Sequence, residues 1–319
     1  MPLSFSNNRS RRSFFKNAVL SVGGSILIPK QLLATATQPV ILDKQAFRIV
    51  QITDSHVFNE KSKQHTGSML ASISGQERPD VIFHTGDVIM DAMKEEKQPV
   101  MDQWALWKTI IAGVTVPIHY CIGNHDIWWN EQHSNDPLFG KVWMQQELGL
   151  PGRYYSFSKA GWHFIFLDST QQDGNKGYTA AIDTEQMEWL TNLLRQIPSS
   201  TPVLIASHIP LLSSSVFEFA KCEENTWKIG ASLMHGDSIN IQKLFRKHTN
   251  IKGCISGHLH LMDHVNYDNI QYMGSGAVSG NWWSNSTFHQ TTSGYSVLDL
   301  FRDGTIKREY KVYDWEKQT

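Results

Sequence analysis

The chain has 319 residues, of which 29 are Lys or Arg and 30 are Asp or Glu, so its formal net charge is −1. Residues 1–36 hold five of the basic residues and no acidic ones, which leaves 24 basic against 30 acidic residues, a net charge of −6, in residues 37–319. A chain this acidic is poorly suited to neutralising nucleic-acid phosphates, so we expect no nucleic-acid-binding surface.

The first 36 residues are organised like an export signal. Arg11 and Arg12 stand in a basic stretch, an apolar stretch follows at residues 18–28, and Ala34 and Ala36 offer a small-x-small cleavage site. This resembles a twin-arginine signal, which implies recognition by the twin-arginine export machinery and removal of the segment. The alternative is a disordered basic tail.

Cleavage after the signal would leave residues 37–319, which we expect to form a single domain in the periplasm or otherwise exported. The apolar stretch is shorter than the roughly 20 residues that span a bilayer. We therefore expect no stable membrane anchor after cleavage.

Farther along, five apolar runs each end in a short polar turn, as strands do where they enter loops. The runs are residues 48–53, 81–85, 119–122, 203–207 and 252–256. Their turns carry, in order, Asp54 and His56, Asp87, Asn124 and His125, His208, and His258 and His260. Taken alone, each histidine is more often a hydrogen-bonded structural residue, but the ordered set predicts a two-metal site at one sheet edge.

Local spacing adds detail to this prediction. In extended backbone, residues i and i+2 point to the same side, so Asp54 with His56, and His258 with His260, are each expected to hold one ion together. Glycines at positions 86, 123 and 257 are expected to let the backbone turn sharply and approach the ions.

In this order the residues resemble the pattern D-x-H, GD, GNH[DE], H, GHxH of the calcineurin-like metallophosphoesterase superfamily, over residues 48–273. The resemblance implies an α/β fold of two mixed β-sheets packed face to face and flanked by helices. It implies one ion held by Asp54, His56, Asp87 and His260. It implies a second ion held by Asp87, Asn124, His208 and His258, so that Asp87 bridges the two.

The donor set predicts the chemistry. Oxygen and imidazole ligands suit Mn, Fe, Zn or Co, and the absence of cysteine argues against a thiolate zinc site. Two such divalent ions about 3.5–4 Å apart would lower the pKa of a bridging water, so that hydroxide attacks phosphorus in line. Together with the bridging Asp87, His125 is expected to be catalytic, protonating the leaving alkoxide or stabilising charge on phosphoryl oxygens. Asp126 is expected to orient its ring.

Between these blocks the pattern alternates strands with helices. Helical spacing links Val100, Trp104 and Trp107, and again Leu190 and Leu194, where Asp183 is the expected N-cap and Gln186 the partner in a capping box. Hairpins are expected across residues 160–161 and 302–304. We expect no disulfide framework from the three cysteines.

Substrate contacts are expected from loops. Trp128 and Trp129 follow the Gly-Asn-His-Asp block, and Trp282 and Trp283 follow a glycine-rich loop. Aromatic faces there would stack on a base or sugar or contact a lipid group, with ordinary packing as the alternative. Polar stretches at residues 58–66 and 130–139 are expected to rim the pocket.

The sequence thus predicts an exported, dinuclear-metal hydrolase of a small-molecule phosphomonoester or phosphodiester. No tyrosine follows Gly86 and Asp87 closely, which disfavours the iron centre of purple acid phosphatases. The same block lacks the arginine with which phosphoprotein phosphatases contact phosphate, which disfavours a phosphoprotein substrate. Two alternatives remain open: a nucleotide- or phospholipid-directed phosphodiesterase, and a non-catalytic carbohydrate-binding or scaffold protein that keeps its metals for folding. The intact His125 argues against the second.

Overall fold

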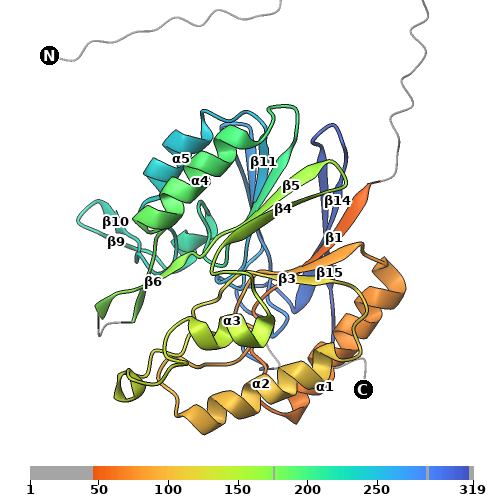
Figure 1. Cartoon of the computed structure of the whole chain (residues 1–319), viewed down its shortest axis with the longest axis vertical. Coiled ribbons are helices and arrows are strands. Elements are labelled where there is room, and N and C mark those ends of the chain that lie inside the picture. Colours follow the sequence, from red (N-terminus) through yellow and green to blue (C-terminus); the bar gives the residue numbers. More distant parts are fainter. Residues whose placement is uncertain (1–45, 175–176, 285–286, 316–319) are drawn as a thin grey trace, which may run out of the picture. The chain divides into compact units, whose positions relative to one another are not determined.

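The computed structural model describes residues 46–174, 177–284 and 287–315. These lie in one compact unit, Lys44–Thr319, and the expected export signal lies outside the described residues. Two mixed β-sheets pack face to face, and helices cover their outer faces (Figure 1). The expected fold class is confirmed.

The first sheet has five strands in the order β15-β14-β1-β2-β3. Their bounds are β1 Phe47–Ile52, β2 Val81–His84, β3 Ile118–Tyr120, β14 Gly294–Leu300 and β15 Ile306–Val312. Because β1, β2 and β3 run parallel, their carboxyl ends meet at one edge.

The second sheet has six strands in the order β12-β13-β11-β8-β5-β4. Their bounds are β4 Tyr155–Lys159, β5 Trp162–Phe166, β8 Val203–Ala206, β11 Ile251–Ser256, β12 Asp263–Tyr267 and β13 Ile270–Gly274. Strands β5, β8, β11 and β13 run parallel. All five strands predicted before the polar turns are confirmed.

Alternating side chains fill the space between the sheets. In β1, Phe47 and Ile49 join the core between the sheets, whereas Val50 and Ile52 join the core under the helices. This period of two follows from the pleat of a strand. Burial of each such side chain stabilises the fold by roughly 1.5–3 kcal/mol.

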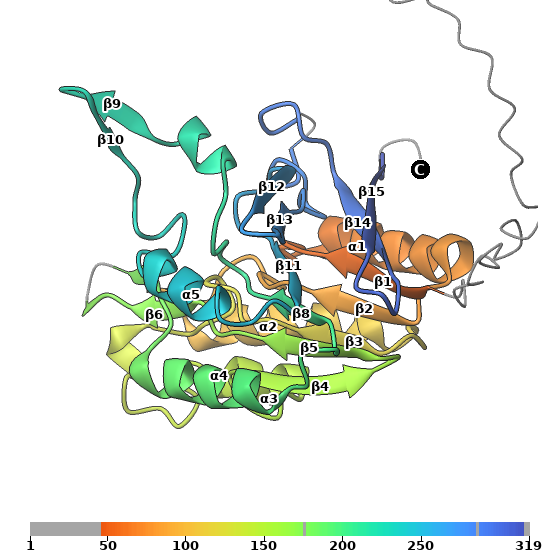
Figure 2. The ribbon, with the colours of Figure 1, turned by 90° about the horizontal axis from the view of Figure 1, so that it is seen from above.

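The helices divide between the two outer faces (Figure 2). The first sheet is covered by α1 (Glu60–Ser72), α2 (Lys97–Ile111) and α3 (Val142–Leu148), and the second by α4 (Thr184–Gln196) and α5 (Ser238–Phe245). The two predicted helices are α2 and α4, and both are confirmed. Among the described helices, none has the length and apolar character needed to cross a membrane.

Two local predictions are wrong. Asp183 caps α4 as expected, but the side chain of Gln186 bonds the backbone N–H and C=O of Asp168, each at 2.8 Å, and so takes no part in a capping box. Most of the polar stretch 58–66, expected among the loops that rim the pocket, begins α1, where a capping box forms between Asn59 and Ser62. A helix start with few apolar side chains resembles a polar loop in sequence.

The two predicted hairpins are confirmed as β4 with β5 and β14 with β15. Two short ribbons remain: β6 (Thr170–Gln172) with β7 (Tyr178–Ala180), and β9 (Lys221–Glu223) with β10 (Thr226–Lys228). Figure 2 shows the second ribbon projecting away from the sheets. Cys121, Cys222 and Cys254 are all free thiols.

Candidate metal centre

The structure brings the seven predicted ligands together where the two sheets meet. Each lies in the loop after a strand. The loops after β1, β2 and β3 carry Asp54 with His56, Asp87, and Asn124, and the loops after β8 and β11 carry His208, and His258 with His260. Three donors, Asp54, His56 and His260, form one group, and three more, Asp87, His208 and His258, form another. Strands more than a hundred residues apart thus deliver donors to a single place.

The first group is buried and tight. Oδ1 of Asp54 lies 3.3 Å from Nε2 of His260 and 3.9 Å from Nε2 of His56. The two histidine Nε2 atoms are 3.2 Å apart. Three donor atoms therefore converge on one small volume.

The second group includes the predicted amide ligand. Nε2 of His208 lies 3.1 Å from Oδ2 of Asp87, 3.0 Å from Oδ1 of Asn124 and 3.2 Å from Nδ1 of His258. The same Oδ2 of Asp87 is 3.8 Å from Nε2 of His56 in the first group. Asp87 thus stands between the two groups.

The expected extended geometry of the two i, i+2 pairs is wrong. Asp54, His56, His258 and His260 have φ values of 52°, 42°, 71° and 56°, in the left-handed region and not the extended one. Asp54 and His56 still share a group, but His258 and His260 face different groups. Non-glycine residues in this region cost backbone energy, which surrounding contacts must offset.

Backbone carbonyls orient three of the histidines. The outer nitrogen of His208 bonds the carbonyl of Thr85 at 2.8 Å, that of His258 bonds Ser232 at 2.9 Å, and that of His260 bonds Gly280 at 3.1 Å. A carbonyl accepts a hydrogen bond only from a nitrogen that carries a proton, so in the neutral form of each ring the inward nitrogen is an acceptor. This is the arrangement of a metal-binding imidazole.

The electrostatics also fit divalent cations. Burial opposes ionisation of Asp54 and Asp87, but nearby histidines outweigh it and hold the pKa of both carboxyls below the ordinary range. Within the described residues, their ion pairs are with histidines alone. Oδ1 of Asp54 is buried without a hydrogen-bond partner. Buried charge of this kind needs a compensating cation, so the donor set fits two metal ions.

Protonation of the imidazoles supports the same conclusion. Burial lowers the pKa of His56 to about 3, and burial together with His208 lowers that of His258 to about 3, so both rings are neutral near pH 7. For His208, burial is outweighed by Asp87, which raises the pKa to about 9. Asp87 thus favours positive charge beside it, which fits a place for a divalent cation.

His125 lies beside these groups and is partly open to solvent. Its ring meets that of His56 edge to face at 5.1 Å, and its Nδ1 is 3.5 Å from Oδ1 of Asp91. Burial lowers the pKa of His125, but Asp87 and Asp91 outweigh it and raise the pKa to about 9. The Asp91 carboxylate, which is not one of the seven donors, thus favours the protonated form of the ring, the form that can act as an acid.

Asp91 was missed in the sequence, and the expectation for Asp126 is wrong. The buried Asp126 accepts hydrogen bonds from the backbone of Gly123, Val88 and Ile89, so it joins two loops and does not hold the ring of His125. Its pKa is raised to about 7 by burial and by Asp87. Asp91 stands four residues after Asp87 in the same loop, and that proximity was the available signal.

The three glycines serve two different needs. Gly86 has a φ of +100°, which supports the expected sharp turn. A Cβ at Gly123 would lie 2.0 Å from the backbone nitrogen of Asp87, and one at Gly257 would lie 2.5 Å from Oδ2 of Asp54. At these two positions the need is close approach of the loops.

The four candidate tryptophans occupy different environments. Trp128 is fully buried and donates to the carbonyl of Glu95, so its position fits packing and gives no support to a substrate contact. Trp129 is half-buried. Trp282 is 42% exposed, with its ring centroid 4.2 Å from that of His56, whereas Trp283 is buried.

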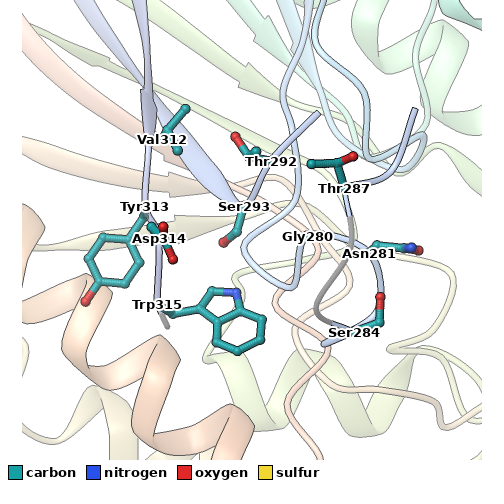
Figure 3. Close-up of a pocket in the computed structure, with 10 residues that line it drawn as sticks. All are labelled: Gly280, Asn281, Ser284, Thr287, Thr292, Ser293, Val312, Tyr313, Asp314 and Trp315. Atoms are coloured by element: carbon teal, nitrogen blue, oxygen red, sulfur yellow. The ribbon is translucent and has the colours of Figure 1, made fainter. Parts of the chain in front are cut away.

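Two pockets border the loops around the site. One of about 160 Å³ lies between the turn at Gly280 and the segment ending at Trp315, and it holds none of the clustered donors (Figure 3). The other, about 290 Å³, is lined by Met93, Trp129 and Gln172 among others. Residues 130–132 line this second pocket, which like the first holds none of the clustered donors, so a rim of the substrate pocket at residues 130–139 stays a prediction.

Comparison of the sequence with known proteins gives the same family as the motif pattern. The family model for calcineurin-like phosphoesterases matches residues 47–262. The chain is 27% identical to a 3′,5′-cyclic-nucleotide phosphodiesterase of Nostoc sp., over 82% of this chain and 91% of the relative. It is 23% identical to the 3′,5′-cyclic adenosine monophosphate phosphodiesterase CpdA of Escherichia coli K12, over 82% and 88%.

Solved structures share the fold at lower identity. A dimetal phosphatase from Danio rerio is 14% identical with a TM-score of 0.61, over 83% of this chain and 96% of that one. GAP50, described as the anchor in the inner membrane complex of Plasmodium, is 17% identical with a TM-score of 0.53, over 84% of both chains. These two likenesses concern the fold.

Substitution of Gly123 by alanine tests the close approach at the site. Gly123→Ala changes no donor but displaces Asp87, so we expect metal affinity to fall about 10- to 100-fold, as when a residue supporting a ligand is lost. Titration calorimetry with Mn or Zn measures this. Gly67→Ala in α1, where a Cβ meets nothing within 4 Å, is the control and should keep full affinity. Unchanged affinity in Gly123→Ala would contradict the predicted role of Asp87.

Proposed function

The chain belongs to the calcineurin-like phosphoesterase family and is a metal-dependent phosphoester hydrolase, and we propose that it cleaves 3′,5′-cyclic nucleotides outside the cytoplasm. The observation that carries the chemistry is the pair of donor groups joined by Asp87, with His125 beside them. The substrate class rests on relatives that span most of this chain and are named as cyclic-nucleotide phosphodiesterases.

Two metal ions would be held by the seven donors. Asp54, His56 and His260 would bind one ion, and Asn124, His208 and His258 the other, with Asp87 shared. The ions, when bound, supply the Lewis acidity that makes water a nucleophile near neutral pH and neutralises charge on phosphoryl oxygens. Nitrogen and oxygen donors without thiolates favour Mn, Fe, Zn or Co.

His125 would complete the reaction by protonating the leaving oxygen. The carboxylate of Asp91, whose Oδ1 lies 3.5 Å from Nδ1 of His125, favours the protonated ring. Its own backbone N–H donates to Oδ1 of Asp87 at 2.8 Å, so the acid and the shared donor are held together. Opening of a cyclic diester needs such an acid, because the leaving group is an alkoxide.

The alternative substrates are a simple phosphomonoester and a phospholipid. Hydrolysis of p-nitrophenyl phosphate alone would favour the first, and hydrolysis of bis(p-nitrophenyl) phosphate without cyclic AMP would call for an assay with phospholipid. A scaffold role is the alternative of another class, and GAP50 is an example of the fold in a protein described as an anchor. A protein that kept metals only for folding would have no use for a protonated histidine beside a carboxylate. His125 and Asp91 therefore favour the enzyme.

Export would follow the twin-arginine route. The support is the sequence at Arg11 and Arg12 with the apolar stretch after them. That route carries folded proteins, which fits a centre assembled from loops on two sheets.

Hydrolysis assays with purified protein test the proposed substrate. Loaded with Mn, Fe, Zn or Co, the protein should hydrolyse cyclic AMP and bis(p-nitrophenyl) phosphate, and Asp87→Ala should lose both ions and all hydrolysis. Metal analysis and product chromatography are the measurements. Activity on p-nitrophenyl phosphate alone would redirect the assignment to a phosphomonoesterase. An Asp87→Ala protein that keeps two ions would refute the bridging role.

His125→Ala tests the acid. The backbone N–H that holds Asp87 remains, so metal content should be unchanged, while kcat for cyclic AMP should fall about 10²- to 10⁴-fold. The loss should be much smaller for bis(p-nitrophenyl) phosphate, because nitrophenolate leaves without a proton. His264→Ala, at an exposed position in β12, is the matched control. Equal losses for both substrates would argue against an acid role.

Replacement of the paired arginines tests export. The double variant Arg11→Lys with Arg12→Lys should remain in the cytoplasm at full length, because the twin-arginine machinery reads both guanidinium groups. Cell fractionation and immunoblotting report the location and the cleavage. Normal delivery of the double variant would rule this route out.

A further inference from the structure

Trp282 lies directly against the candidate metal centre. Its ring centroid is 4.2 Å from that of His56 and 4.8 Å from that of His260, with tilts of 36° and 32°. It also meets His125 at 5.5 Å. The indole therefore covers the imidazoles of two predicted ligands while its residue stays 42% exposed.

The loop that carries Trp282 is tied to the site by its backbone. Val278 and Ser279 donate to the carbonyls of Thr53 and Asp54 at 2.9 and 3.2 Å. The carbonyl of Gly280 bonds His260 at 3.1 Å. The position of Trp282 is thus fixed relative to both metal-bearing loops, and the indole is not a side chain on a free loop.

The neighbouring Trp283 fixes the turn that follows Gly280 by contacts on its buried side. Its Nε1 donates to the carbonyl of His56 at 2.8 Å, and its ring lies 6.0 Å from that of Trp315, which closes the pocket under the turn (Figure 3). One tryptophan of the pair is buried and structural. Trp282, by contrast, is exposed at the surface.

The backbone at this pair is strained. Trp282 and Trp283 have φ values of 53° and 62°, a region that bulky residues seldom adopt. Two consecutive residues in this conformation persist only where surrounding contacts impose it, and such strain is concentrated at functional sites. This conformation places the exposed indole of Trp282 against the candidate metal centre, and an exposed ring adds little to the packing of the core.

We propose that Trp282 is a specificity-determining residue, the surface on which the aromatic base of a nucleotide stacks while its phosphate lies at the metal centre. This rests on the proposed function of the site. Stacking on an aromatic side chain tolerates any base, because every base has a π-face. Trp282 would therefore select nucleotides over base-free sugar phosphates without selecting among bases.

The test compares two inhibitors within each variant. AMP and ribose 5-phosphate share the phosphate and the sugar, so the ratio of their inhibition constants against bis(p-nitrophenyl) phosphate isolates the base. In the metal-loaded wild-type protein AMP should inhibit about 5- to 150-fold more strongly. Trp282→Leu should bring the ratio close to one, whereas Trp282→Phe should keep most of it.

Trp227→Leu is the matched control. Trp227, on β10 of the projecting ribbon, is also exposed, at 55%, and its ring contacts that of Phe217, so its loss should leave the ratio unchanged. Quenching of tryptophan fluorescence by AMP gives a readout independent of turnover and should be lost in Trp282→Phe. Because each ratio is taken within one protein, partial loss of metal affects both inhibitors alike.

The outcomes separate this proposal from the proposed substrate. A wild-type ratio near one, or a ratio that survives Trp282→Leu, would overturn the role of Trp282. If the ratio collapses in Trp282→Leu yet the wild-type protein does not hydrolyse cyclic AMP, the base-stacking surface stands and the cyclic-nucleotide assignment fails. If both inhibitors weaken equally, Trp282 supports the site without recognising a base, and the proposal is wrong.

Discussion

The buried carboxylates of Asp54 and Asp87 are the constraint on which the rest of this structure depends. Each is removed from water, and among the described residues its ionic partners are histidines. An uncompensated buried charge is costly, so the surrounding loops supply N–H donors, neutral imidazoles and room for cations. The left-handed residues, the glycines that allow close approach and the carbonyls behind the histidines all follow from that requirement.

The sequence predicted the fold class and the convergence of the seven candidate donors, for a physical reason. Strand periodicity and polar residues at strand ends are local patterns, and the strands of β1, β8 and β11 occur where those patterns placed them. The predictions that were wrong concerned the direction in which a side chain points. Gln186 reached Asp168 and not its own cap, Asp126 bonded three backbone groups, and His258 parted from His260, because tertiary contacts decided each orientation.

The fold alone does not explain the chemistry. Proteins as different as a dimetal phosphatase and a membrane-complex anchor share it with this chain. Function depends on particular residues carried by the fold. In this chain they include His125, which pairs with Asp91, and the exposed Trp282. In the proposed function, His125 with Asp91 would act when the bond breaks, and Trp282 would help to select the molecule that is bound.

The donors come from both sheets, and this has a consequence for folding. His56 follows a strand of the first sheet and His260 a strand of the second, 204 positions apart. An ion held by both residues would cross-link the chain and close a very long loop, much as a disulfide would; the three cysteines of this chain are free thiols. Metal binding would therefore hold the two sheets together. The cofactor would then make unfolding of the chain more cooperative, in addition to its part in catalysis.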